Sequence, residues 1–484
     1  MSDDLHVSPE RILSWIRTAQ LSPRVNISSL PRHALLEIFK FYVDQIDHVD
    51  DWHTLVHVCR EWRDIVFSSP RWLCLELRCT NKSPVKRLLD VWPALPIVID
   101  ALTTKSRRSG VANIMAALKR HDLVCRIKIW RVPNSLLKSA AIKKRFPQLT
   151  DLTLRSNKAN APVIPDSFLG GSAPRLRLLD FKGITFLFPA LRKLLLSAAG
   201  LVTFRLWDIP NSGIISSEPF VTSLSTLTRL RELFIGFRSP RSRADRERRH
   251  PTLFKRLVLP SLTEFYFKGD SEYLEDIVGR MDAPALERVA ITFFNQLVFD
   301  TPLLCDFLSR TEVFQEPRRA DVTLARSCVK FTLSYPEGVA DRRMLEVGIS
   351  SSVLEWQLSS LAQFCNTSLP PLPTLECLGI HTNFPMGPES TDGIESALWL
   401  ELLNSFITVK DLVLFGSLIQ YAAPALREIT GEGGPKVLPA LRHIFLGWFQ
   451  INPSAREAIA QIVTARQLCG HPVSLNPTET DRSW

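Results

Sequence analysis

The 484-residue sequence predicts an α/β protein in which a compact helical module precedes an irregular solenoid of strand–helix repeats. Two observations predict this class: apolar spacings of three and four within the first seventy residues, and a short apolar phrase that recurs over the remainder. We divide the chain into an N-terminal helical extension at 1–22, the helical module at 23–73 and the solenoid at 74–484, with a basic insertion loop at 238–256.

The helical module is predicted from two apolar faces. A first helix is expected after Pro31, whose fixed φ suits a first helical turn, and its apolar face comprises Leu35, Leu36, Phe39, Tyr42 and Val43. A second face is expected, with Asp50 or Asp51 as N-cap, to run through Trp52, Leu55, Cys59, Trp62 and Val66. About fifty residues form too small a core to be stable alone, so the module needs a partner or a domain packed behind it.

The module also carries an ordered set of short motifs: Leu30-Pro31, Ile38-Phe39, Val58-Cys59-Arg60, Trp62-Arg63 and Pro70-Arg71-Trp72. This pattern resembles the F-box, in the form common among fungal members. The resemblance implies a trihelical fold that docks on a Skp-type adaptor and, through it, on a cullin–RING ubiquitin ligase. The residues that it places at the adaptor contact are Leu30, Pro31, Ile38, Leu55, Val58 and Cys59. The alternative is a helical hairpin that only caps the following domain.

The repeat phrase has an apolar residue at its first, fourth and sixth positions. Copies begin at Val124, Leu149, Leu176, Leu201, Leu230, Leu262, Leu286, Cys328, Val353, Leu375, Val409 and Leu441, and Trp72 is a candidate first copy. Between them we expect helices at 189–199, 272–281, 302–308, 395–406 and 453–468. Most separations lie near the period of leucine-rich repeats, and such units bury their apolar flanks only by stacking. The array therefore resembles a degenerate leucine-rich repeat solenoid; the alternative is an α/β domain of another kind.

The third, fifth and seventh positions of the phrase point away from the core, because strand side chains alternate between two faces. They nominate ten substrate-binding candidates on the inner side of the solenoid: Arg126, Lys128, Trp130, Asp151, Arg155, Lys182, Arg205, Trp207, Tyr266 and Lys268. Arginine and aromatic residues are frequent anchors of protein interfaces, and arginine pairs bidentately with carboxylate or phosphate. A phosphorylated or acidic segment of a substrate would suit this stripe. The alternative is that these residues serve solubility alone.

The net charge of +10 is concentrated in one stretch. Residues 238–256 hold eight Lys or Arg against two acidic residues, a net +6, which argues against a basic face spread over the fold for nucleic acid. We expect this stretch to be a solvated loop, with nuclear import, phosphorylation-dependent docking or nucleic-acid binding as alternatives. No apolar run is long enough to span a bilayer. The nine cysteines include no Cys-x-x-Cys pair, and we expect buried, reduced thiols.

No residue pattern points to catalysis. His53 and His57 have the spacing of a zinc-binding helix but lack the glutamate of His-Glu-x-x-His, and the glycines at 431–434 fail the spacing of a phosphate-binding loop. We therefore expect neither an enzyme nor a cofactor or metal site.

Together these features indicate the substrate-recognition subunit of an SCF-type ubiquitin ligase in the cytoplasm or nucleus. Its expected partners are a Skp-type adaptor, a cullin reached through that adaptor and an unidentified protein substrate, with no membrane and no nucleic acid. Two alternatives stay open: a scaffold that uses the F-box outside a ligase, and a nuclear or RNA-associated binding protein that uses the basic loop.

Overall fold

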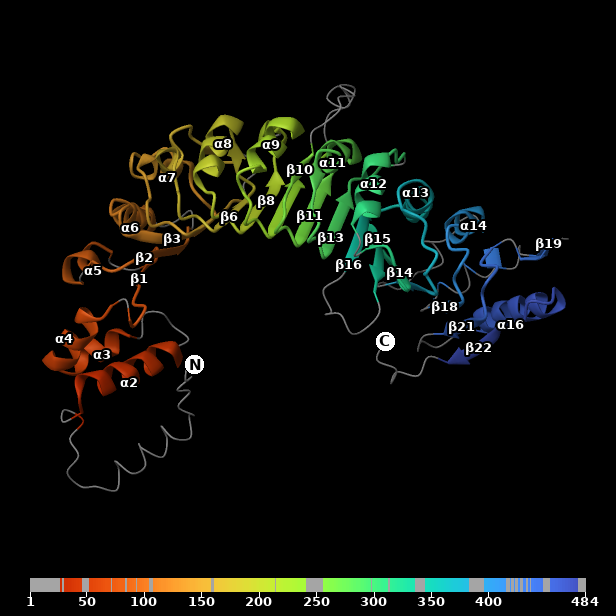
Figure 1. The fold of residues 1–484 in the computed structure, drawn as a ribbon, viewed down its shortest axis with the longest axis horizontal. Helices are drawn as coiled ribbons and strands as arrows, with labels where there is room; N and C mark the ends of the chain where they lie inside the picture. Colours follow the sequence, from red (N-terminus) through yellow and green to blue (C-terminus); the bar gives the residue numbers. More distant parts are fainter. Residues whose placement is uncertain are drawn as a thin grey trace, which may run out of the picture.

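The computed structural model is an arc whose inner side is one 16-stranded sheet and whose outer side carries the helices of the solenoid (Figure 1). The strand order is β1-β2-β3-β4-β6-β8-β9-β11-β13-β16-β15-β14-β17-β18-β21-β22. The structure describes residues 30–45, 52–70, 72–82, 85–92, 94–103, 108–157, 161–213, 215–240, 256–296, 298–311, 314–335, 344–382, 396–414, 437–446 and 453–477, together with 27, 418, 422, 425–426, 430–431 and 434–435. The predicted extension at 1–22 and most of the basic loop lie outside these residues.

The described part of the N-terminal module contains the helices α2 (Arg32–Gln45), α3 (His53–Val58) and α4 (Arg60–Ser68). The predicted single face from Trp52 to Val66 is in fact two helices, because Cys59 has an extended backbone with φ −155° and ψ 174°. Its sulfur accepts a hydrogen bond from the amide of Trp62 at 3.4 Å and thereby caps α4. The N-cap position of α3 is Trp52, without a side-chain cap, whereas Asp50 and Asp51 lie outside the described residues.

The module packs against the first unit of the solenoid, which contains β1 (Leu77–Cys79), α5 (Val85–Val91) and β2 (Ile97–Leu102). The indole of Trp52 is buried, and its Nε1–H donates to the carbonyl of Glu76 at 3.1 Å. The ring of Trp92 meets Trp52 edge-on at 5.3 Å and stacks on His53 at 4.6 Å. The small helical core is thereby completed by the solenoid behind it, as its size requires.

Strands β3 to β13 form the regular half of the sheet, in which each strand is parallel to the next. These strands are β3 (Val124–Trp130), β4 (Asp151–Arg155), β6 (Leu178–Lys182), β8 (Thr203–Ile209), β9 (Glu232–Phe237), β11 (Glu264–Gly269) and β13 (Arg288–Phe293). Helix α6 (Arg108–Leu118) precedes these strands, and α12 (Pro302–Arg310) follows them. The helices between them are α7 (Asn134–Leu137), α8 (Phe188–Ser197), α9 (Ser217–Leu224) and α11 (Ser271–Val278). The seven phrases from Val124 to Leu286 each begin at, or two residues before, one of these strands.

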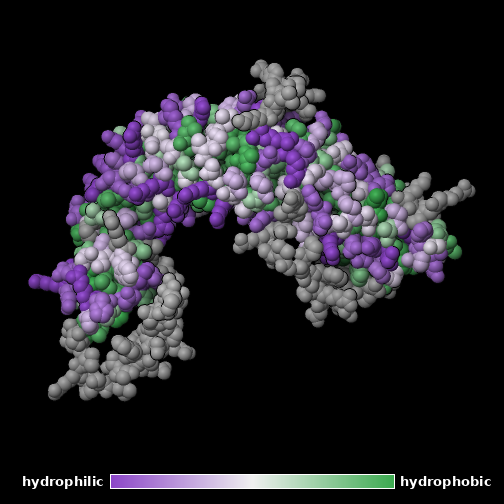
Figure 2. All heavy atoms as spheres, in the orientation of Figure 1, coloured by the Kyte–Doolittle hydropathy of each residue, from purple (hydrophilic) through white to green (hydrophobic). Residues whose placement is uncertain are grey.

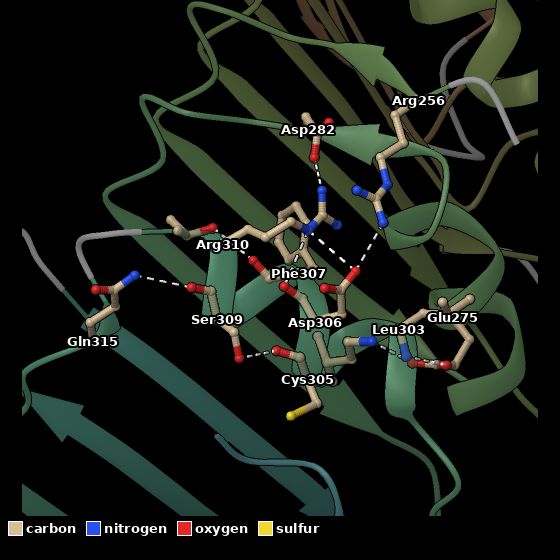
Figure 3. A network of polar contacts seen from close by, with 12 residues as sticks. Arg256, Glu275, Asp282, Leu303, Cys305, Asp306, Phe307, Ser309, Arg310 and Gln315 are labelled. Carbon is tan, nitrogen blue, oxygen red and sulfur yellow. Dashed lines mark hydrogen bonds and ion pairs between the residues drawn. The ribbon is translucent and has the colours of Figure 1, made fainter. Parts of the chain in front are cut away.

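Short ladders and ion pairs tie neighbouring units together on the outer side. The ladders are β5 (Val163–Ile164) with β7 (Thr185–Phe186), and β10 (Leu257–Val258) with β12 (Met281–Asp282). Helix α12 is also held by polar contacts (Figure 3). The carboxylate of Glu275 accepts from the amides of Leu303 and Leu304 at 2.9 and 2.7 Å, which satisfies two donors of the first helical turn. Arg256 pairs with Asp306 at 2.9 Å, so the last residue of the basic loop is fixed to this helix.

The regular order is interrupted after α12. Strand β15 (Cys328–Ser334) runs antiparallel to both of its neighbours, β14 (Arg319–Ala325) and β16 (Met344–Ser350), and β16 rather than β14 pairs with β13. Two predicted repeat phrases are therefore wrong. The phrase at Cys328 is an antiparallel hairpin strand, and the phrase at Val353 begins helix α13 (Leu354–Thr367), because buried residues continue there at helical spacing.

The chain then returns to parallel pairing through β17 (Cys377–Thr382), β18 (Asp411–Leu414), β21 (His443–Leu446) and β22 (Ser474–Pro477). This part of the chain also contains the helices α14 (Ser396–Leu403) and α16 (Pro453–Leu468), and the ladder of β19 (Thr430–Gly431) with β20 (Gly434–Pro435). The guanidinium of Arg466 is buried under α16 and donates to the carbonyls of Val437 and Leu438. Burial lowers the pKa of Arg466 to about 10.

The thiols differ from the expected pattern in their exposure. All nine cysteines carry reduced thiols, but Cys59, Cys74 and Cys469 are exposed, and only Cys79 and Cys365 are buried. Among the described residues, no helix is both long and apolar enough to cross a membrane.

Candidate functional site

The ten predicted stripe residues all lie on the inner face of the regular half of the sheet. The strand registers bring equivalent phrase positions side by side, so that one row crosses the sheet through Lys128, Thr153, Asp180, Arg205, Phe234 and Tyr266. We call the ten residues the inner stripe. Figure 2 shows hydrophilic side chains along the inner edge of this half of the arc.

The three arginines of the inner stripe are each paired with a carboxylate: Arg126 with Glu76, which precedes β1, and the other two with carboxylates of neighbouring strands. Arg155 pairs with Asp180 at 2.6 Å, and Arg205 holds both carboxylate oxygens of Glu232, one of them at 2.7 Å. The hydrogen bond to Glu232 raises the pKa of Arg205. Asp180 is only 2% exposed, so its carboxylate is buried and is not accessible to a partner. The guanidinium donors that we expected to bind a carboxylate or phosphate of a partner are thus already bound to carboxylates of the same chain.

The lysines of the inner stripe are arranged differently. Lys128 lies 5.5 Å from the ring of Trp130, and Lys268 lies 5.9 Å from the ring of Phe294. Within the described chain, no carboxylate comes within ion-pair distance of either ammonium group. Lys182 lies 6.0 Å from the ring of Trp207 and 3.4 Å from Asp208. These cations rest on aromatic rings and keep hydrogen-bond donors toward solvent.

Three aromatic rings from adjacent strands stack on one another at the centre of the stripe. The rings of Trp207 and Phe234 have centroids 3.5 Å apart, and those of Phe234 and Tyr266 have centroids 5.9 Å apart. We call these three residues the aromatic stack. Its two ends carry cations, since Lys182 lies against Trp207 and the guanidinium of Arg288 lies 5.8 Å from Tyr266.

A backbone irregularity makes room for the stack. The register of β8 with β9 shifts between Leu206 and Ile209, and Asp208 has φ +49°, which are the marks of a β-bulge. The absence of a side chain at Gly236 also makes room for the stack, because a Cβ at this position would lie 2.7 Å from the ring of Phe234. The sequence placed Trp207 and Tyr266 on the inner face but gave no signal for the bulge, so the stack itself was not predicted.

The tyrosine of the stack is held neutral. Its hydroxyl donates to Glu264 at 2.7 Å. Burial, together with this carboxylate, raises the pKa of Tyr266 to about 12. The residue therefore contributes ring contact and one hydrogen bond, without charge, at physiological pH.

A second polar cluster lies on the inner face of the irregular half. Asp321 accepts from Arg319 at 2.8 Å and is bonded to His381 Nε2 at 2.8 Å. Burial alone would raise the pKa of Asp321, but these two partners hold it below its usual value. The three side chains close over Gly379, where a Cβ would overlap the carboxylate of Asp321.

The residues predicted at the adaptor contact fall into two groups. Pro31 and Cys59 are exposed, as are Ile38 at 43% and Val58 at 58%. Leu30 is half-buried. Leu55 is only 6% exposed and packs in the core of the module, so its assignment to an exposed contact face is wrong.

The two imidazoles considered for metal binding lie beside an aromatic ring. His53 stacks on Trp92, and His57 meets the same ring edge-on at 6.3 Å. In the described part of the chain, no three His, Cys, Asp or Glu side chains gather in a way that could hold a metal ion.

Comparisons with known proteins add little. No protein-family model and no curated protein matches the chain. Among solved structures, the leucine-rich repeat-containing protein LegL7 from Legionella pneumophila aligns over 71% of this chain and 95% of its own, with 14% identity and a TM-score of 0.28. A likeness at this level carries no weight for fold or function.

Proposed function

We propose that this chain is the substrate-recognition subunit of an SCF-type cullin–RING ubiquitin ligase. The observation that carries the proposal is an exposed apolar face on a helical module whose own core is already complete. Leu35 and Phe39 fill that core, whereas Ile38 and Phe41 of the same helix are 43% and 46% exposed. An apolar face of this kind, rimmed by polar residues, is typical of a docking surface.

The positions of the resemblance support an adaptor as the occupant of that face. Pro31 lies immediately before α2, and Val58 and Cys59 lie at the junction of α3 and α4. All three are exposed, so the segments that resemble the F-box contact are accessible. The face would be closed to an adaptor only if the solenoid covered it.

The solenoid supplies the second half of the proposal. Its inner face offers aromatic and cationic side chains across seven neighbouring strands, a composition suited to a protein interface. Held there, a client would be brought close to the conjugating enzyme that the ligase recruits. The contribution of this chain to ubiquitination is then a raised effective concentration, while catalysis belongs to other subunits.

The geometry of the aromatic stack argues against the nucleic-acid alternative. Proteins that bind single strands offer open aromatic faces on which bases stack. Here the faces of Trp207, Phe234 and Tyr266 are occupied by one another and by cations. A partner can therefore contact the edges of the rings but not their faces, and ring edges pack well against apolar side chains.

The adaptor assignment is tested by charge placement on the exposed face. The double variant Ile38→Asp and Val58→Asp is expected to lose co-purification of a Skp-type adaptor and cullin, because two carboxylates would be buried without partners. Val163→Asp is the matched control, since Val163 is 51% exposed on the outer side of the solenoid and its replacement should leave co-purification unchanged. A folded double variant, verified by circular dichroism, that still retains the adaptor would contradict the proposal.

A further inference from the structure

The three lysines of the inner stripe are spaced along the sheet at intervals that an extended chain can match. Lys128 is on β3, Lys182 on β6 and Lys268 on β11, which are two and then three strands apart in the sheet. With neighbouring strands about 4.8 Å apart, the intervals are roughly 10 and 14 Å. At about 3.3 Å per extended residue, these distances equal roughly three and four residues.

Charge on the inner face is also polarised along the strands. The third phrase position, at the beginning of the strand, holds the carboxylates Asp151, Glu232 and Glu264 against Arg126 and Arg288. The seventh position, at the end of the strand, holds Arg155, Lys182 and Lys268 and no carboxylate, and Lys128 lies at the fifth position. An acidic partner is therefore favoured near the ends of the strands over their beginnings.

We propose that the inner stripe binds an extended acidic segment of its client, which crosses the strands near their C-terminal ends. The segment places one carboxylate at each of Lys128, Lys182 and Lys268, with an apolar side chain on the aromatic stack between the last two. This inference rests on the proposed function, since it specifies the client that the solenoid would hold.

The occupant is a carboxylate segment rather than a phosphorylated one because of how the cations are distributed. A phosphate carries nearly two charges and is best held by several donors at once, above all by arginine forks. Arg155 and Arg205 are committed to Asp180 and Glu232 within the sheet. What remains is single ammonium groups roughly 10 Å or more apart. Lys182 also lies 3.4 Å from Asp208, but an ammonium group has three donors and can bind a second carboxylate.

The test uses the full-length chain and a fluorescein-labelled peptide, Glu-Gly-Ser-Glu-Ser-Leu-Gly-Glu, whose glutamates are three and four residues apart. Fluorescence anisotropy is expected to show saturable binding that weakens as salt is raised. The triple variant Lys128→Glu, Lys182→Glu and Lys268→Glu should reduce affinity by about tenfold to a hundredfold. The matched control Lys138→Glu, Lys143→Glu and Lys193→Glu changes three exposed lysines outside the inner face and should bind like the unaltered chain.

Several results would overturn the inference. These are absence of peptide binding to the unaltered chain, equal binding by the inner triple variant, and tighter binding when phosphoserine replaces the central glutamate. Adaptor co-purification is measured on the same variants. The inner triple variant should keep the adaptor, and the Ile38→Asp and Val58→Asp variant should keep the peptide, so the inference and the proposed function fail in different assays.

Discussion

The two halves of the sheet use the same face in different ways. From β3 to β13, each strand lies parallel to the last, and long side chains at matching positions meet across strands in ion pairs and ring stacks. Beyond β13, the antiparallel strands β14 to β16 interrupt this order, and glycine stands at inner positions 348 and 379. Regular stacking thus produces an extended surface, whereas the interruption produces a local cluster that closes on itself around Gly379.

Among the variants that test this difference between the two halves, Gly379→Ala is expected to change the stability of the protein most. The new methyl group would overlap the Asp321 carboxylate and lie 2.7 Å from His381 Nε2, so the cluster must open. We expect a loss of about 1 kcal/mol in the free energy of unfolding, because the overlapping atoms are ends of side chains that can move aside only by weakening their contacts with one another. Denaturant titration followed by circular dichroism measures it.

Gly348→Ala is the matched control for this prediction. Gly348 also lies on the inner face of the irregular half, but the nearest atom to an added Cβ would be the Thr292 hydroxyl at 3.4 Å, an ordinary contact. This variant should unfold within about 0.5 kcal/mol of the unaltered chain. Equal losses at the two glycines would mean that the cluster is not what distinguishes Gly379.

A smaller change in stability is expected when the pH is lowered enough to protonate Asp321. The pKa of Asp321 is held below its usual value, so its contribution to stability is present above the unfolded-state pKa of about 3.9 and is lost as pH falls through the folded value. Asp321→Asn should therefore unfold at a lower temperature near neutral pH, and the difference should shrink as pH falls below about 4. Thermal melts across this range would contradict the assignment if the difference stayed constant.

The smallest effect is expected in the regular half, from the pair Arg205 and Glu232. The pair is bidentate but partly exposed, so a double-mutant cycle with Arg205→Met and Glu232→Gln should give a coupling of about 0.5–1 kcal/mol. Unfolding free energies of the four proteins provide the measurement. A coupling energy near zero would show that the ion pair with Glu232 does not hold Arg205 in place.

Most of the regular half could be predicted from the sequence, because each strand repeats one apolar phrase and buried positions alternate with inner ones. The same reasoning failed at Val353, since a phrase with apolar residues at the first, fourth and sixth positions also fits a helix. It missed β2, whose alternating Ile97, Ile99 and Ala101 lack that phrase, and it missed β14 and β16 within the interruption.

The candidate site could be predicted as a set of positions but not as a set of contacts. Placing Arg205 on the inner face requires only the two-residue period of a strand. Knowing that it binds Glu232 requires the register of β8 against β9, and knowing that Trp207 stacks on Phe234 requires the bulge at Asp208. The exposure of side chains in the helical module could not be predicted from the sequence either, because Leu55 was assigned to the adaptor contact and yet is only 6% exposed.

The packing of Trp52 against Trp92 and Glu76 has a consequence for geometry. The helical module is packed against the first strands of the solenoid. Each further strand therefore lies one strand spacing farther from a partner bound to the module. From β1 to β11 there are seven such increments, or roughly 34 Å. Within the proposed ligase, the choice of lysine on the client would then be set by this length, and removing one whole unit would move the modified lysine rather than abolish modification.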